Sequence, residues 1–218
     1  MLTNLFSSFD PSTKLFMQLN WISLLFIMLI LPNKFWFSES RNSMTKKILL
    51  KFIYKEMKFI YFNKQMLNIL KSMFMVILII NISGLIPYMF TPTSHISISM
   101  TLSLPIWFAL MSFSWMNFTN LMFAHLLPLN TPSLIAPFMI MVESVSNLIR
   151  PISLSVRLTA NMIAGHLIMT LLGNINFIKL MPMILVIQIL LMLFEISVAM
   201  IQAYVFTILM TMYYSEIP

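Results

Sequence analysis

One arginine lies in the middle of a long apolar stretch of this chain. Hydrophobic sequence flanks Arg157 on both sides before any strong turn signal appears. An ionised guanidinium at membrane depth costs ~2.5–3.5 kcal/mol, and arginine does not lose its proton to avoid that cost. Arg157 therefore needs a carboxylate partner, a water-filled cavity or both, and this need indicates transport of ions or protons.

Polar residues recur around Arg157 at helical spacing. Steps of three and four residues place the following side chains in one stripe of a helix, which drifts by ~20° per heptad: Glu143, Asn147, Arg150, Leu154, Arg157, Asn161 and Ala164. A second stripe repeats every seven residues and contains Gln188, Glu195 and Gln202. Because polar side chains facing lipid lose their hydration, such stripes predict aqueous clefts or a partner surface.

Several of these residues also have a purely structural interpretation, and the sequence leaves both open. Arg157 could form an internal salt bridge with Glu195 or Glu143, and either carboxylate could be an ordinary hydrogen-bonded group. His166 could be a packing residue, although titration near neutral pH suits a proton relay. The amides are as suited to hydrogen bonding between helices as to function: Asn161, Gln188 and Gln202.

The composition indicates the kind of protein that positions these residues. The chain has 218 residues, of which 60% are hydrophobic and 9% charged, and its mean hydropathy is +0.92. These values are typical of integral membrane proteins. With Gly 3 and Cys 0, glycine-rich phosphate loops, disulfides and thiolate metal sites are excluded. We therefore expect no metal and no cofactor.

The apolar runs predict an all-α integral membrane protein with about five crossings and one amphipathic surface helix, in a single membrane domain 1–218. Two runs are unusually long, because as helices they would measure ~50–60 Å against a hydrocarbon core of ~30 Å. Few polar turn residues interrupt them, so each is predicted to be one strongly tilted helix, and the two to form a hairpin, with Pro151 kinking the first. The predicted spans are 15–31, 72–90, 97–118, 132–172 and 180–214, and the surface helix is 46–64.

Basic residues concentrate in one region between Lys34 and Lys71. Such a block could bind nucleic acid, but its apolar interleaving favours a membrane surface. Four lysines fall on one helical face, where they would meet anionic head groups: Lys47, Lys51, Lys55 and Lys58. Because positive loops stay on the side of synthesis, five crossings place the N-terminus outside and the C-terminus inside.

Three segments resemble motifs of subunit a of mitochondrial F-type ATP synthase. The segment SVRLTANMIAGHL, from Ser155 to Leu167, is similar to the arginine signature of that family. The segments EISVAMIQAYVF (195–206) and AHLLP (124–128) resemble two other motifs. The abundance of methionine and phenylalanine, and of lysine over arginine, is similar to proteins encoded by compact organellar genomes.

This resemblance implies a stationary, non-catalytic subunit that conducts protons past a rotating ring of c-subunits. It implies further membrane-sector and peripheral-stalk partners, and a multi-pass position in the mitochondrial inner membrane, with the N-terminus toward the intermembrane space and the C-terminus toward the matrix. Arg157 would attract each ring carboxylate and separate two aqueous half-channels. The other residues that match the family's motifs are Glu195 and His166 for the intermembrane-space relay, Glu143 for the matrix exit, Gln202 opposite the arginine, and Asn161 one turn from it.

Two other functions remain open at this point. A proton-pumping subunit of a respiratory complex usually carries intramembrane lysines paired with glutamates, and no lysine occurs between Lys71 and Lys179. A structural membrane anchor would use the polar stripes only to bind neighbouring helices.

Overall fold

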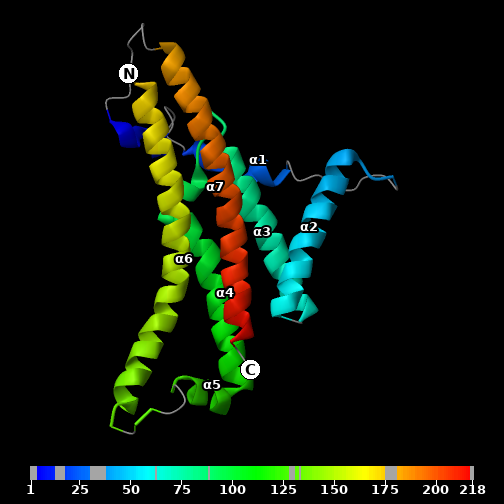
Figure 1. Cartoon of the computed structure of the whole chain (residues 1–218), viewed down its shortest axis with the longest axis vertical. Helices are drawn as coiled ribbons and strands as arrows, with labels where there is room; N and C mark the ends of the chain where they lie inside the picture. The colour runs from blue at the N-terminus through cyan, green and yellow to red at the C-terminus, as the bar shows by residue number, and fades with distance from the viewer. Residues whose placement is uncertain are drawn as a thin grey trace.

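The structure is a computed structural model of the chain, and it describes residues 4–12, 18–29, 38–61, 63–87, 89–127, 131–132, 134–174 and 181–216. Every regular element in these ranges is helical (Figure 1). Four of the described helices are long and apolar enough to cross a membrane, namely α3, Lys64–Gly84; α4, Ile96–Asn117; α6, Ala136–Gly173; and α7, Met181–Ser215. The predicted all-α membrane fold is confirmed.

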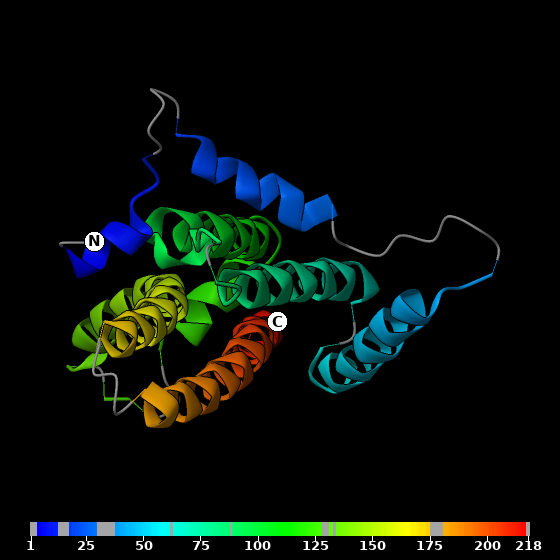
Figure 2. The ribbon, with the colours of Figure 1, turned by 90° about the horizontal axis from the view of Figure 1, so that it is seen from above.

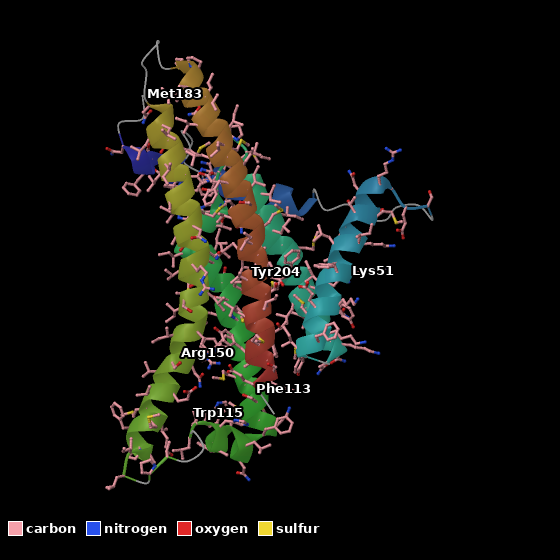
Figure 3. All side chains as sticks on the ribbon, in the orientation of Figure 1. Lys51, Phe113, Trp115, Arg150, Met183 and Tyr204 are labelled. Carbon is pink, nitrogen blue, oxygen red and sulfur yellow. The ribbon has the colours of Figure 1, made fainter. Side chains whose placement is uncertain are left out.

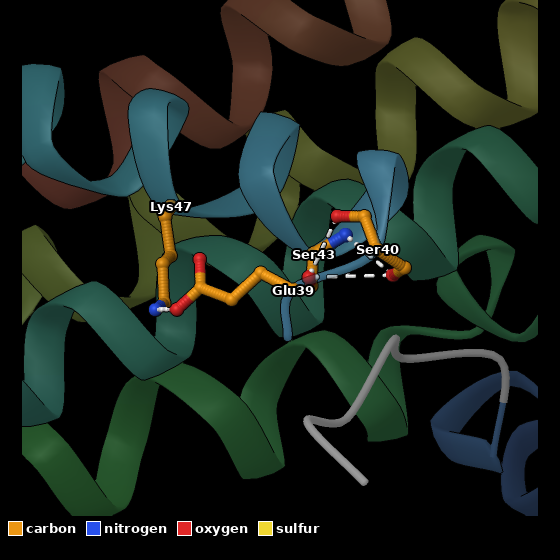
Figure 4. Close-up of polar contacts among 4 residues, drawn as sticks. All are labelled: Glu39, Ser40, Ser43 and Lys47. Atoms are coloured by element: carbon orange, nitrogen blue, oxygen red, sulfur yellow. Dashed lines mark hydrogen bonds and ion pairs between the residues drawn. The ribbon is translucent and has the colours of Figure 1, made fainter. Parts of the chain in front are cut away.

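The predicted surface helix corresponds to α2, Arg41–Ile60. Its first turn is closed by Ser40, whose hydroxyl accepts the backbone N–H of Ser43 at 3.3 Å, and Glu39 pairs with Lys47 on the next turns (Figure 4). One face of α2 is buried through Ile53 and Met57, whereas the four lysines of the predicted row are exposed: Lys47, Lys51, Lys55 and Lys58. Attachment of this helix to a membrane surface stays a prediction.

The helix α3 begins at Lys64, before the predicted start of the second span at residue 72. The cause is local, because the Asn63 side chain accepts the backbone N–H of Gln65 and so provides a helix cap. The helix α4 contains Pro105 in its interior, and a short helix that the sequence did not predict, α5, Thr119–His125, follows it.

The two longest helices, α6 and α7, form the predicted hairpin. At 1.5 Å per residue, 38 and 35 residues correspond to ~57 and ~52 Å, which exceeds the ~30 Å of a hydrocarbon core. Figure 1 shows α6 bowed along its length, and Pro151 within it removes one backbone hydrogen-bond donor. Long tilted helices packed side by side, as predicted, are therefore confirmed.

The four long helices pack in two layers. Figure 2 shows α6 and α7 in one layer, with α4 behind α6 and α3 behind α7, and these same pairs are in contact. The shared core lies where the layers meet, and its fully buried side chains include Leu67, Ile77, Leu158, Phe206 and Met210. The outer face of α6 and α7 has no second layer over it among the described residues.

The predicted first span, 15–31, is described only in part. Its described portion holds the 3-10 helix η2, Leu19–Trp21, and the eight-residue α1, Ile22–Leu29, which contacts α3. Figure 2 shows α1 running across the axis of the four long helices. Residues 13–17 and 30–37 lie outside the described part, so this crossing stays a prediction.

Candidate functional site

Arg157 is exposed on α6, beside the exposed apolar side chains Val156 and Ile152. In the part of the chain that the structure describes, no carboxylate lies within ion-pair distance of its guanidinium, and the alternative salt bridges to Glu195 and Glu143 are not formed. An arginine placed mid-helix in an apolar surface remains costly without a counter-charge. The described residues therefore supply no carboxylate partner for Arg157.

A cavity of about 280 Å³ lies between α6 and α7, on the C-terminal side of Arg157 along α6. Its polar lining is formed by Asn81, Asn161, Glu195 and Gln202. We call it the upper cavity, because the part of α6 that lines it, residues 161–168, lies in the upper half of Figure 1. The Asn161 amide donates to the Gln202 carbonyl oxygen at 2.9 Å, which joins the two polar stripes across the hairpin. The cavity thus brings together three of the residues singled out in the sequence.

Glu195 fits against α6 because residue 165 is glycine. A Cβ atom at Gly165 would lie 3.0 Å from both Cδ and Oε1 of Glu195, a contact so tight that the glutamate would have to shift by a few tenths of an ångström. Close packing of the glutamate on the backbone of the facing helix therefore depends on this glycine.

Asn81 was not singled out from the sequence. It lies on α3 and is fully buried, yet neither atom of its amide has a hydrogen-bond partner in the described residues. Buried amides are normally hydrogen-bonded, and its position at the upper cavity suits contact with water there. Its sequence signal was weak, because a single asparagine in an apolar helix is equally suited to helix packing.

His166 is separated from this cavity, although it follows Gly165 directly. Its ring lies next to the backbone of Gly84 and edge-on to Phe9, at 6.2 Å between ring centroids. Its Nε2 atom is buried and has no partner among the described residues. No hydrogen bond joins His166 to Glu195 within those residues, so a relay between the two stays a prediction.

A second cavity, of about 460 Å³, lies toward the opposite end of the hairpin. Glu143, Asn147 and Arg150 line it from α6, together with Glu216 from the end of α7. We call it the lower cavity; Figure 3 shows Arg150 on the corresponding part of α6. Glu216, which was not singled out from the sequence, is one of its two carboxylates.

Arg150 holds the polar lining of the lower cavity together. Its guanidinium pairs with Glu216, lies 3.8 Å from Glu143, and stacks over the Tyr213 ring at 4.8 Å. These contacts connect α6 to the C-terminal end of α7 through an interhelical ion pair. In this geometry Arg150 neutralises carboxylates of its own chain, in contrast to Arg157.

Buried side chains separate the two cavities. Leu154, Ser155 and Leu158 of α6 are at most 2% exposed, and none of them lines either cavity. Along α6, the lower cavity extends to Arg150 and the upper begins at Asn161, a separation of about 16 Å at 1.5 Å per residue. Arg157 lies within this interval.

Metal chemistry receives no support from this arrangement. Nowhere in the described ranges do three histidine, aspartate or glutamate side chains gather in a way that could hold a metal ion. The arrangement places carboxylates beside both cavities, and a carboxylate can bind and release a proton.

Comparisons with known proteins agree with the sequence motifs. A family model described as ATP synthase A chain matches residues 15–215. The chain is 45% identical to ATP synthase subunit a of Drosophila melanogaster over 224 residues, and 46% identical to that of Locusta migratoria over 225 residues. Both alignments cover 100% of this chain and of the relative. The chain therefore belongs to the ATP synthase subunit a family, whose members are membrane-sector subunits of the rotary ATP synthase.

Proposed function

We propose that this chain is the stationary, non-catalytic proton path of the membrane sector, and that its two cavities are half-channels opening on opposite sides of the membrane. The observation that carries the proposal is the position of Arg157, exposed and unpaired in the described structure, between two separate polar cavities. A proton that enters one cavity cannot reach the other through the buried residues between them. It must cross on a group supplied by another chain.

The exposed face of α6 and α7 fits a partner that carries a carboxylate at mid-membrane. In a rotating c-ring, each subunit would bring one such group to Arg157. An opposite charge within ~4–6 Å lowers the pKa of a carboxylate by about 1–3 units. Arg157 would thus favour release of the proton from each arriving carboxylate and would stop direct passage of protons between the half-channels.

The other site residues follow this path. Glu195 would exchange protons at the upper cavity with His166 behind it, while Glu143 would serve the lower cavity. Asn161 and Gln202, joined across the hairpin, would hold α6 and α7 in register next to Arg157. Peripheral-stalk subunits would hold the chain against the moving ring.

We further propose that the upper cavity opens to the intermembrane space and the lower to the matrix, in the mitochondrial inner membrane. The basic start of α3 and the C-terminal end of α7 lie at the same end of the bundle, whereas the described N-terminal segment lies at the other end (Figure 1). Because positive residues stay on the matrix side, that end of the bundle faces the matrix.

Side-specific labelling tests the two half-channels, and the natural chain contains no cysteine. Val198→Cys lines the upper cavity and Asn147→Cys the lower. We expect a membrane-impermeant thiol reagent to modify each variant from one side only, and the two from opposite sides. Leu158→Cys, at a position with 0% exposure between the cavities, should react from neither side. Labelling of Val198→Cys and Asn147→Cys from the same side would contradict the proposal.

A second prediction concerns the glycine beneath Glu195. Gly165→Ala should reduce ATP-driven proton pumping several-fold, because the new methyl group displaces the glutamate from its place on α6. Gly173→Ala is the matched control: there the nearest atom to an added Cβ is Nε2 of Gln188, at an ordinary 3.6 Å. The control should pump normally, since alanine is favoured over glycine inside helices. Equal pumping by both variants would show that the position of Glu195 is not critical.

A further inference from the structure

The N-terminal segment of the chain lies over His166. The 3-10 helix η1, Leu5–Phe9, contacts α6, and the Phe9 ring meets the imidazole of His166 edge-on at 6.2 Å between centroids. On the other side of His166, a Cβ at Gly84 would come within 3.2 Å of Met162 and Thr91, so α3 packs tightly there. These contacts leave Nε2 of His166 buried.

His95 fixes this segment in place. Its Nε2 lies 2.9 Å from the backbone carbonyl oxygen of Phe9 and can donate to it. The imidazole itself packs against two aromatic rings, at 5.2 Å from Trp21 and 5.5 Å from Phe90. An oriented donor of this kind sets the position of the Phe9 backbone, and through it the position of the Phe9 ring.

The outer side of the segment carries polar groups beside the exposed ring of Phe6. Ser7 and Asp10 are exposed, and the Asp10 carboxylate accepts the backbone N–H of Ser12 at 3.0 Å. This hydrogen bond lowers the pKa of Asp10, so the carboxylate stays charged at neutral pH. A segment with a charged outer side and Phe9 turned inward is suited to lie between water and His166.

We propose that residues 5–12 are a cover that separates His166 from the aqueous phase, and that His95 is the positioning residue that keeps the cover closed. This further step rests on the proposed function. Protons on the N-terminal side of the bundle then reach the chain first at Glu195 in the upper cavity, and His166 exchanges protons only after Glu195. The cover thus sets the order in which the two groups receive protons from the aqueous phase, with Glu195 first and His166 second.

Labelling of a cysteine at position 166 tests the cover directly in the intact complex. We expect His166→Cys to react slowly with a membrane-impermeant thiol reagent added on the N-terminal side. Adding His95→Ala or Phe9→Ala should accelerate the reaction about fivefold, the effect of losing one neutral hydrogen bond or a comparable contact. His95→Gln, whose amide can donate to the same carbonyl, should restore slow labelling.

Phe6→Ala is the matched control, since Phe6 lies on the same short helix but is 68% exposed. It should leave the labelling rate unchanged. Two results would overturn the cover: equal rates with and without His95→Ala and Phe9→Ala, or labelling of His166→Cys as fast as that of an exposed Phe6→Cys.

The order of the two groups is tested by proton pumping. If Glu195 is the group of first access, Phe9→Ala should restore part of the pumping lost in Glu195→Gln by opening a direct route to His166, and Phe6→Ala should not. Accelerated labelling without this recovery would overturn the order. Failure of the proposed function would be seen in a different experiment, as normal pumping by Arg157→Ala. That result would leave the labelling rates of His166→Cys unchanged.

Discussion

Replacing Arg157 by alanine should abolish ATP-driven proton pumping while the subunit remains in its complex. The guanidinium is exposed and makes no ion pair within the described structure, so its removal breaks no internal contact of that kind. A ring carboxylate at this site would lose the opposite charge that lowers its pKa by about 1–3 units. At a pH where the carboxylate is mostly protonated, its ionised fraction would fall roughly ten- to a thousandfold. Proton release would then stop.

Pumping and passive proton flux should be measured together in reconstituted vesicles. We expect the passive leak to persist or to increase in Arg157→Ala, because the proposed charge barrier between the two half-channels is gone. Arg41→Ala removes an exposed arginine of α2 and should behave like the unmodified chain. Normal, coupled pumping by Arg157→Ala would mean that the arginine is structural, and the proposed mechanism would be wrong.

The second large effect is expected for Glu195→Gln. Glu195 is the single titratable side chain among the described residues that line the upper cavity. Glutamine keeps nearly the same shape but cannot exchange a proton, so the cavity would still hold water without a proton carrier. Removal of a positioned proton-transfer group typically costs about 100- to 10,000-fold in rate, and we expect proton flux to fall at least about a hundredfold.

Glu56→Gln provides the control for loss of a carboxylate. Glu56 lies on α2, outside both cavities, and accepts a hydrogen bond from the Tyr204 hydroxyl at 2.8 Å, which the glutamine oxygen can also accept. Figure 3 shows Tyr204 on the side of α7 toward α2. This variant should pump normally. Unchanged flux in Glu195→Gln, with the complex intact, would instead favour the structural-anchor function.

The sequence was sufficient to predict the features that depend on helical periodicity. The spacing from Glu143 to Ala164 predicted one face of α6, and in the structure members of that face line both cavities. The scarcity of polar turn residues in the two long runs correctly indicated single helices, because a reversal inside a membrane would leave backbone groups unpaired.

Contacts between segments far apart in the chain were not predictable in the same way. Asn81 and Glu216 reach the cavities from α3 and from the end of α7, and no local pattern indicates which face of either segment is turned inward. His95 received no role from the sequence, because its partner, the Phe9 carbonyl, belongs to the backbone and carries no sequence signal.

The two-layer packing has a mechanical consequence. In the proposed function, a rotor moving past α6 and α7 would load them sideways, across their axes. A free hairpin ~50 Å long would bend under such a load, but α4 backs α6 and α3 backs α7, and the core side chains interlock the layers. Because close-packed interiors are nearly incompressible, the second layer acts as a stiff support for the bearing surface. Under the proposed function, torque would then reach the rest of the complex with little loss to elastic deformation of this subunit.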